Sequence, residues 1–461
     1  MIAITGSIGS GKSFVSSVIR EAGFEVIDAD AFAHELYRKN TELRNKIAQE
    51  FGNEAIDENG INRKFVVNLI SDAPKKLEIL ENILYPVLTA EIEKINPDFV
   101  EAAVLYKCPE LEKKMKGIWM VEAKEDAQQE RIAERNRGNT TWSYNLMQIQ
   151  KSNSAKFCAS TSAKTKIIEN NSTKDECKKQ VLELLNIPAT VQKDISLKKF
   201  TTFKIGGNAK FFAEPKDIEE IQALLAWRKE FEIPYFVLGH GSNVLFEDYK
   251  GLVIKFGNSL HSLIQDAAKK CLGGLEKLEG IPGTIGGAIF MNAGAHGQQI
   301  SDCVKSVTSI NESGEIITRT KEECEFSYRS SIFKGIEPEI IVSAEFDFIH
   351  KPKETIDMNR KEVLAWRRAK QPLQYPNAGS IFKNPAGQLS AGALIESCGL
   401  KGCAVGDAQV SELHANFIVN KGNATAEDVK ALMEKIAKTV KDVHGVELSA
   451  EIICPSSSSK M

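Results

Sequence analysis

Residues 4–14 of the chain read ITGSIGSGKSF, and this stretch decides the fold of the residues around it. Within it, Gly6 to Ser13 match the full pattern G-x-x-x-x-G-K-[ST]. An apolar strand pattern precedes the motif and a helical pattern follows it, which is the context that a phosphate-binding loop requires. A glycine-rich turn without a ligand is the alternative. All four fixed positions and both flanks favour the phosphate-binding loop.

In such a loop the backbone N–H groups converge on phosphate oxygens, and the N-terminus of the following helix adds partial positive charge. We expect the Lys12 ammonium to neutralise the terminal phosphates and the Ser13 hydroxyl to ligate Mg²⁺. The residues predicted to hold the nucleotide are Gly9, Ser10, Gly11, Lys12, Ser13 and Phe14.

Two carboxylates follow in FEVIDADAFAHEL, residues 24–36. If EVIDAD is a strand, Asp28 and Asp30 lie on one face at its carboxyl end, where ligands bind in open α/β sheets. One carboxylate there suits a base for an attacking hydroxyl, and the other suits an outer-sphere partner of Mg²⁺. Either aspartate is alternatively the N-cap of the helix that follows. The sequence leaves these assignments open.

Length and composition limit the class of protein. A chain of 461 residues predicts two or three domains. With 42% apolar residues, 26% charged residues and a formal charge of −3, it gives no electrostatic reason to expect nucleic acid or acidic membranes as partners. No apolar run approaches the roughly 18 residues of a membrane span. We therefore expect a cytoplasmic protein whose nine scattered cysteines are reduced thiols, with no protein partner implied.

The patterning changes near residue 188. Before it, apolar strands alternate with helices, which predicts a parallel sheet covered by helices on both faces. The stretch NIPATVQKDISL lacks strong periodicity and is interpreted as the linker. Beyond it, glycine becomes denser and the strands shorter, which favours an α+β architecture. We predict three domains, at residues 1–187, 188–335 and 336–461.

Over about residues 1–185, the first half resembles dephospho-CoA kinase in the stretches ITGSIGSGKSFV, GFEVIDADAFAHEL, FGNEAIDENGINRKFVVNLI, LENILYPVL, WMVEAKEDAQQERIAERN and IIENNS. The resemblance implies transfer of the ATP γ-phosphate to the ribose 3′-hydroxyl of dephospho-CoA. It places Arg63 on the substrate side and Arg131 and Arg135 in a lid. The chain has Tyr85-Pro86 where the family usually has His-Pro, and AAVLYKC where the family usually has a proline-containing strand. A kinase for another nucleoside-like acceptor is the looser alternative.

The second half holds glycine loops of another kind, in TTFKIGG (201–207), LGHGSNVLFED (238–248) and GIPGTIGGAIFMNAG (280–294). Their spacing is neither that of a Gly-Lys-Ser loop nor the dinucleotide pattern G-x-G-x-x-G. Loops of this type, close to short strands, can present backbone donors to a pyrophosphate, although tight turns also require glycine. The residues predicted to contact the cofactor are Gly239, Gly241, Ser242, Asn243, Gly280, Pro282, Gly283, Thr284, Gly286 and Gly287.

Together with FSYRSSIFK, NAGSIFKNP and SELHANFIVN, these loops resemble UDP-N-acetylenolpyruvoylglucosamine reductase, in its compact subtype, over about residues 190–455. The resemblance implies that NADPH reduces FAD and that FADH₂ reduces an enolpyruvyl double bond to a lactyl ether. The implied fold class is an α/β P-loop kinase domain followed by an α+β FAD-binding reductase with a flavin domain and a substrate domain. After GLVIKFG, the chain lacks short strands that the family usually has.

That reduction leaves an enolate-like carboxylate, which must be stabilised and then protonated on carbon. By the resemblance, Ser380 donates the proton, while Arg329 and Glu451 flank the developing charge. Lys383 and Asn384 are predicted to contact the diphosphate. The structural alternatives are a turn hydroxyl for Ser380, a surface ion pair for Arg329 and an exposed strand residue for Glu451.

The sequence therefore predicts a bifunctional enzyme that uses ATP and Mg²⁺ in one half and FAD and NADPH in the other. Its small-molecule substrates are dephospho-CoA and UDP-N-acetylenolpyruvoylglucosamine. The alternative is that only one half is active and the other is a ligand-binding or regulatory module.

Overall fold

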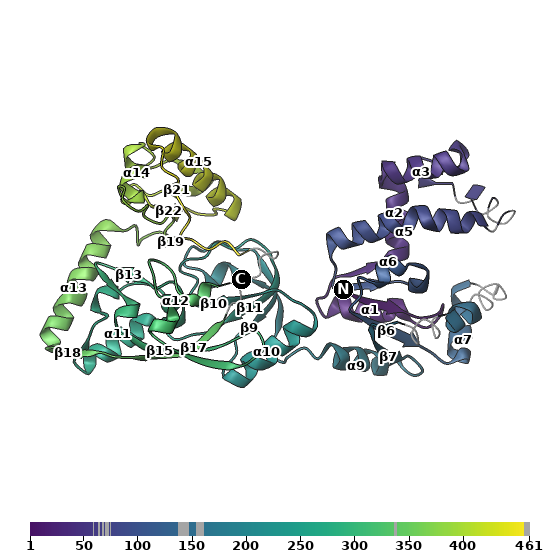
Figure 1. Ribbon diagram of the computed structural model, residues 1–461, viewed down its shortest axis with the longest axis horizontal. Helices are drawn as coiled ribbons and strands as arrows, with labels where there is room; N and C mark the ends of the chain where they lie inside the picture. Colours follow the sequence, from purple (N-terminus) through teal and green to yellow (C-terminus); the bar gives the residue numbers. More distant parts are fainter. Residues whose placement is uncertain are drawn as a thin grey trace. The chain divides into compact units, whose positions relative to one another are not determined.

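A computed structural model describes the chain apart from residues 59, 63–64, 67–68, 70–72, 74, 137–146, 154–160, 336–338 and 456–461. The chain folds into two compact units, Met1–Ile187 and Pro188–Met461 (Figure 1). Each unit has its own sheets and its own apolar core, so each is described by itself.

The first unit is built on a five-stranded sheet in the order β2-β5-β1-β6-β7. The strand pairs are all parallel, as the alternation of strands and helices predicts. The inner strands are buried on both faces, which explains their continuous apolar sequences. The strands are β1 (Ile2–Thr5), β2 (Val26–Asp28), β5 (Phe99–Glu101), β6 (Gly117–Glu122) and β7 (Lys164–Glu169).

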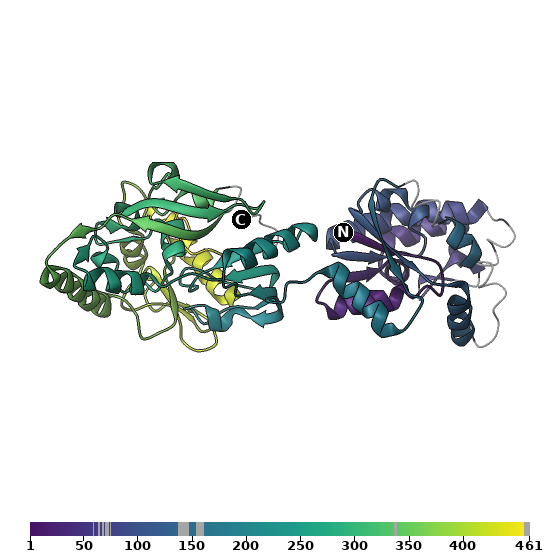
Figure 2. The ribbon, with the colours of Figure 1, turned by 90° about the horizontal axis from the view of Figure 1, so that it is seen from below.

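Helices cover both faces of this sheet (Figure 2). Helices α1 (Lys12–Glu21) and α9 (Lys174–Leu185) contact one another. Helices α2 (Ala29–Lys39), α3 (Thr41–Phe51) and α5 (Lys75–Ile95) form a lobe with a shared apolar core. The remaining elements are the hairpin of β3 (Ile56–Asp57) and β4 (Gly60–Ile61), and the helices α6 (Pro109–Glu112) and α7 (Glu125–Asn136).

The second unit begins with a four-stranded sheet in the order β10-β11-β9-β8. Three of its strands are parallel, and β8 is antiparallel to β9. Helix α10 (Ile218–Glu230) makes the crossover between β9 and β10. The strands are β8 (Gln192–Ser196), β9 (Asn208–Ala213), β10 (Tyr235–Leu238) and β11 (Tyr249–Lys255).

A second, antiparallel sheet has the order β16-β15-β17. Because β17 pairs with β15, this sheet crosses the predicted domain boundary between residues 335 and 336. The strands are β15 (Val304–Ile310), β16 (Ile316–Thr320) and β17 (Ile340–Phe346), and the helices are α11 (Leu260–Lys269), α12 (Ile285–Phe290) and α13 (Lys353–Lys370). Two short pairs join β12 (Leu272–Gly273) to β18 (Ile349–His350) and β13 (Gly294–Ala295) to β14 (Gln298–Gln299).

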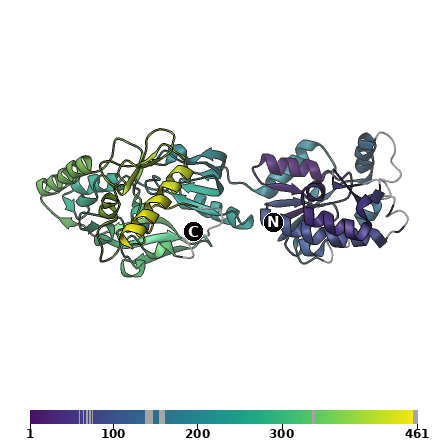
Figure 3. The same ribbon diagram turned by 90° about the horizontal axis from the view of Figure 1, so that it is seen from above.

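The last part of the second unit forms a lobe with its own sheet, in the order β19-β22-β21-β20 (Figure 1). Its strands are β19 (Asn377–Ser380), β20 (Ala404–Val405), β21 (Ala408–Val410) and β22 (Phe417–Asn420), and its helices are α14 (Ala391–Ser397) and α15 (Ala426–His444). Helix α15, yellow in Figure 3, buries Val429, Leu432, Ile436 and Val440 at helical spacing. It ends at Gly445 with φ 68°, where the sequence predicts its C-terminus.

In the part of the chain that the structure describes, no helix is both long enough and apolar enough to cross a membrane.

Helix α15 starts with a capping box, which allows a test of how firmly the lobe is held. The Thr425 hydroxyl accepts a hydrogen bond from Asp428 N, and the Asp428 carboxylate accepts one from Thr425 N. Removing such a cap costs about 1 kcal/mol. We expect Thr425→Ala to speed amide exchange in the first turn of α15 about fivefold, measured by hydrogen–deuterium exchange mass spectrometry. In the control Thr439→Ala, which removes a mid-helix hydroxyl bonded to the Lys435 carbonyl, exchange should not accelerate. Equal effects of the two substitutions would contradict the capping role.

Candidate active sites

The predicted phosphate-binding loop joins β1 to α1 in the first unit. At Gly11, with φ 100°, a Cβ atom would lie 2.1 Å from Nδ2 of Asn170, so only glycine fits there. The Asn170 amide follows β7 and donates to the Ser10 carbonyl at 2.8 Å. The Lys12 ammonium donates to the carbonyls of Gly6 and Ser7 at 2.9 and 3.1 Å. The loop therefore curls around the Lys12 ammonium, which its own carbonyl groups bind.

Ser13 has a partner that the sequence analysis missed. Its hydroxyl donates to Oε1 of Glu101 at 3.0 Å, and Glu101 is buried, with 6% of its surface exposed. Glu101 ends β5, which lies beside β1 in the sheet. A serine hydroxyl and a carboxylate are hard oxygen donors of the kind that Mg²⁺ prefers, so the two residues fit the predicted metal. The parallel arrangement of β1 and β5 brings them together across about 90 residues of sequence.

The structure separates the two aspartates. Asp28 Oδ1 accepts hydrogen bonds from the backbone N–H groups of Asp30 and Ala31, both at 3.0 Å, and so caps α2. Asp30 lies in the first turn of α2, where burial and then the Asp28 charge raise its pKa, while Lys12 and His34 act in the opposite direction. A carboxylate with a raised pKa beside the loop lysine suits a proton acceptor. Asp30 is therefore the better candidate for the base.

Of the three predicted substrate residues of this unit, only Arg131 has a described side chain. The Arg131 guanidinium lies against the loop and donates to the carbonyls of Gly9 and Ser10 at 3.3 Å and of Asn170 at 3.0 Å. Arg63 and the side chain of Arg135 lie outside the described residues.

Two glutamines that the sequence analysis missed also hold the loop. Gln150 Oε1 accepts from Ile8 N at 2.9 Å, and Gln128 Nε2 donates to the Ser7 hydroxyl at 2.8 Å.

The second unit contains a cavity of about 1560 Å³. The two glycine loops on its wall touch one another, because a Cβ atom at Gly239 would lie 2.4 Å from Oγ1 of Thr284. This close approach forms a cradle of backbone groups that suits a dinucleotide cofactor. The cavity is lined by all ten residues predicted to contact the cofactor, namely Gly239, Gly241, Ser242, Asn243, Gly280, Pro282, Gly283, Thr284, Gly286 and Gly287.

The three predicted catalytic residues of this unit, Ser380, Arg329 and Glu451, line the same cavity. Arg329 Nε donates to Glu451 Oε1 at 2.6 Å, and Arg329 Nη2 donates to the Gly294 carbonyl at 3.0 Å. Burial raises the pKa of Glu451, and the Arg329 charge partly offsets this effect. Ser380 ends β19 and follows Gly379, whose φ is 77°. The cavity wall therefore carries a hydroxyl and a half-buried cation–carboxylate pair.

Lys334 supports Arg329 and was missed by the sequence analysis, although it lies within the quoted stretch FSYRSSIFK. Its ammonium donates to the Arg329 carbonyl at 2.8 Å. Arg329 has a left-handed backbone with φ 55°, which is uncommon for a residue with a side chain. Burial, followed by the Lys383 charge, lowers the pKa of Lys334 to about 8. Lys334 therefore helps to hold an otherwise unfavourable conformation at the site.

The structure does not bring the two remaining predicted residues to the cavity wall. Among the described residues, Lys383 and Asn384 are not part of its lining. Asn384 Oδ1 accepts instead from Ala391 N at 3.0 Å, at the start of α14, and the Lys383 charge opposes the rise in the pKa of Glu451. Their predicted contact with a diphosphate stays a prediction.

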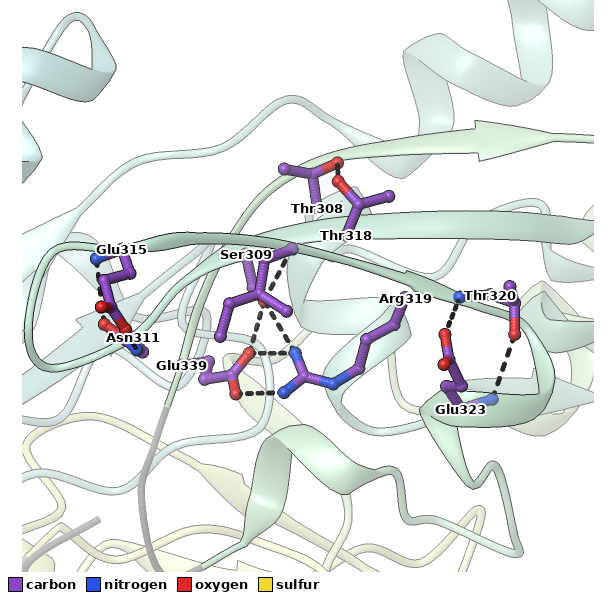
Figure 4. A network of polar contacts seen from close by, with 10 residues as sticks. Thr308, Ser309, Asn311, Glu315, Thr318, Arg319, Thr320, Glu323 and Glu339 are labelled. Carbon is purple, nitrogen blue, oxygen red and sulfur yellow. Dashed lines mark hydrogen bonds and ion pairs between the residues drawn. The ribbon is translucent and has the colours of Figure 1, made fainter.

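An ion-pair network stiffens another part of the wall (Figure 4). Glu339, which precedes β17, lines the cavity, and its carboxylate meets both terminal nitrogens of Arg319 on β16, with one distance of 2.7 Å. The Ser309 hydroxyl on β15 also donates to Glu339. Because Ser309 on β15 and Arg319 on β16 both bind Glu339, the network fixes the start of β17, an edge strand of the sheet, where it borders the cavity.

Three family models match the chain: "Dephospho-CoA kinase" at residues 1–176, "FAD binding domain" at 249–320, and "UDP-N-acetylenolpyruvoylglucosamine reductase, C-terminal domain" at 371–454. The UDP-N-acetylenolpyruvoylglucosamine reductase of Clostridium novyi is 40% identical over 283 positions, which cover 57% of this chain and 91% of that protein. The enzyme of the same name from Agathobacter rectalis is 42% identical, covering 56% and 92%.

The solved structure of UDP-N-acetylenolpyruvylglucosamine reductase (MurB) from Thermus caldophilus matches with a TM-score of 0.50 and 36% identity, and covers 57% of this chain and 98% of that one. The chain belongs to the UDP-N-acetylenolpyruvoylglucosamine reductase family and carries an N-terminal dephospho-CoA kinase domain. The predicted fold class is thereby confirmed.

The match also indicates gaps relative to this relative. The 283 positions matched to the Clostridium novyi protein correspond to 57% of 461 residues, or about 263 residues, so about 20 positions face gaps in this chain. In the structure, only residues 256–259 join β11 to α11, at the point where the sequence analysis notes missing strands. The cavity beside this connection exceeds the usual ligand pocket of about 300 to 1,000 Å³.

The different surroundings of Asp28 and Asp30 lead to a test by pH. Asn caps helices as well as Asp does, so Asp28→Asn should keep α2 intact while removing the charge that raises the pKa of Asp30. If Asp30 must be ionised, the acidic limb of the pH profile of phosphate transfer should move to lower pH in Asp28→Asn. Asp30→Asn should lower turnover by about 10²- to 10⁴-fold. A pH profile unchanged in Asp28→Asn, or normal turnover in Asp30→Asn, would count against this assignment.

Proposed function

We propose that the chain is a bifunctional enzyme. In the first unit it transfers the γ-phosphate of ATP to the ribose 3′-hydroxyl of dephospho-CoA. In the second unit it uses NADPH and FAD to reduce UDP-N-acetylenolpyruvoylglucosamine to UDP-N-acetylmuramate. The observation that supports the proposal is that, in each unit, the glycine loops lie beside polar residues of the kind that the proposed reaction needs. Ser13 and Glu101 meet beside Lys12, while Arg329, Glu451 and Ser380 line one cavity.

In the kinase reaction, the loop backbone and Lys12 bind the phosphates, and Ser13 and Glu101 would hold Mg²⁺. Bound Mg²⁺ supplies charge neutralisation to the phosphate oxygens. Asp30 accepts the proton of the 3′-hydroxyl as that oxygen attacks phosphorus. Its raised pKa makes it a stronger base than an ordinary aspartate, and the charge of its neighbour Lys12 favours its ionised form.

In the reductase reaction, reduced flavin supplies the hydride for the enolpyruvyl double bond. Arg329 and Glu451 hold the substrate carboxylate region, where negative charge develops as the bond is reduced. The Ser380 hydroxyl donates the proton to carbon. Lys334 and the Gly294 carbonyl keep the Arg329 guanidinium oriented during this step. The proposal retains the cytoplasmic location that the sequence predicts.

A substitution in the phosphate loop tests the kinase. Because Lys12 is the cation within the loop, Lys12→Ala should lower phosphate transfer to dephospho-CoA by about a hundredfold or more. The reductase should keep its activity, since Lys12 belongs to the other compact unit. Transfer is measured as ADP formed on the full chain. Lys178→Ala, which breaks an exposed pair with Glu21, is the control and should leave both activities unchanged. Near-normal kinase turnover in Lys12→Ala would refute the phosphate-loop assignment.

A second substitution tests the reductase by separating its half-reactions. Ser380→Ala should leave flavin reduction by NADPH almost intact, because that step needs no proton on the substrate carbon. It should slow flavin reoxidation by the enolpyruvyl substrate by about 10²- to 10⁴-fold, measured by stopped-flow absorbance.

Ser397→Ala, whose hydroxyl bonds to His444 away from the cavity, is the matched control. Equal slowing of both half-reactions would mean that Ser380 shapes the flavin site instead of donating a proton. A purified chain that binds no FAD would make the second unit a non-catalytic module, and the shortened flavin domain would be the physical reason.

A further inference from the structure

One peptide group of the phosphate-binding loop, between Ser7 and Ile8, is held at both of its edges. Its carbonyl oxygen accepts a hydrogen bond from the Lys12 ammonium at 3.1 Å. Its N–H group donates to Oε1 of Gln150 at 2.9 Å. This peptide is trans, so its C=O and N–H bonds point in opposite directions. Gln150 therefore binds the loop from the side away from the Lys12 ammonium.

The surroundings of Gln150 fix its side chain in this position. Only 6% of its surface is exposed. It belongs to a helix at residues 147–153, in which Met147 is buried. On the same helix, Gln148 Nε2 donates at 2.8 Å to Oε1 of Glu125, at the start of α7. The helix is thus docked against α7, other side chains of which also contact the loop.

The loop backbone leaves the Ser7–Ile8 peptide free to rotate if the contact with Gln150 is lost. The peptide lies between Gly6 and Gly9, whose φ angles of 148° and 78° belong to the region that favours glycine. A partly buried N–H group without a partner is unfavourable, so the peptide would turn toward another acceptor or toward water. The same rotation would turn the Ser7 carbonyl away from Lys12.

The position of the Lys12 ammonium depends on that carbonyl. The ammonium donates to the Gly6 carbonyl at 2.9 Å and to the Ser7 carbonyl at 3.1 Å. A lysine ammonium is a point charge on a flexible stem, so its partners decide where the charge lies. Rotation of the peptide would remove one of these carbonyls and direct an N–H dipole toward the cation. The attraction between the displaced cation and the nucleotide phosphates would then be weaker.

We propose that Gln150 is a positioning residue of the kinase site, which fixes the Ser7–Ile8 peptide and through it the Lys12 ammonium. The inference rests on the proposed function for the reaction, and the ligand that it concerns is the polyphosphate of the nucleotide. Because Gln150 binds the outer edge of the peptide, it acts through Lys12. Loss of its amide oxygen should therefore weaken nucleotide binding only while Lys12 is present.

The test is a double-substitution cycle in the full chain, in which binding is measured apart from turnover. The affinity for ATP with Mg²⁺ is measured by calorimetry without the acceptor. Gln150→Leu removes the amide oxygen and should raise the dissociation constant of ATP about fivefold to tenfold. Gln150→Met, whose unbranched side chain has nearly the shape of glutamine, should give the same result if the leucine variant does not fold. In a Lys12→Ala background, Gln150→Leu should change the dissociation constant by less than about twofold.

The matched control is Gln148→Leu, because Gln148 lies on the same helix and makes its hydrogen bond to Glu125 instead of to the loop. Its dissociation constant for ATP should stay within about twofold of the wild-type value. The inference is overturned if Gln150→Leu and Gln150→Met bind ATP normally, if Gln148→Leu weakens binding equally, or if the effects of Gln150→Leu and Lys12→Ala add. If the two residues are coupled but the chain does not phosphorylate dephospho-CoA, the inference stands and only the proposed kinase function fails.

Discussion

The ion pair between Arg329 and Glu451 is the contact on which the architecture of the second unit depends. Glu451 belongs to a short segment near the end of the chain that is bonded on two sides. Its backbone N–H donates to the Ile381 carbonyl at 2.7 Å, and its carbonyl accepts from the Asn243 side chain at 3.0 Å. One residue, Glu451, therefore joins three segments: its carbonyl binds the glycine loop near residue 243, its carboxylate binds the arginine of a later loop, and its N–H binds the end of the strand that carries Ser380. None of these segments is close to the others in sequence, and their convergence creates the site.

Much of this could be predicted from the sequence, for a definite physical reason. Close approaches, such as that of Gly239 to Thr284, require glycine in the loops at residues 6–11 and 239–241. The spacing of these glycines in the sequence therefore indicates the geometry of the loops. The parallel sheet of the first unit and the amphipathic helix α15 follow from the periodicity of buried residues. Ser380, Arg329 and Glu451 came from a family resemblance, and chemistry alone would not have selected them from among similar residues.

The residues that were missed are neighbours only in space. Glu101 meets Ser13 because two strands are adjacent in a sheet, and no local pattern marks it. The division of roles between Asp28 and Asp30 depends on where α2 begins, because Asp28 is the residue at the N-cap position and Asp30 lies in the first turn. Lys383 and Asn384 were predicted to contact the diphosphate, and this stays a prediction; Asn384 Oδ1 accepts a hydrogen bond from Ala391 N at the start of α14.

The two sites solve the same electrostatic problem in unrelated folds. In each, burial raises the pKa of a carboxylate and an adjacent cation opposes the rise: Lys12 acts on Asp30, and Arg329 acts on Glu451. Burial alone would favour the neutral acid, which could not serve as a base and would bind a guanidinium more weakly than a carboxylate does. The cation alone, at a hydrated surface, would hold the carboxylate ionised but too weakly basic to assist. For Asp30, the combination favours an ionised group with increased basicity. This requirement explains why the cation in each site is fixed through backbone carbonyls, those of Gly6 and Ser7 for Lys12 and that of Gly294 for Arg329, since a mobile cation would not maintain the balance.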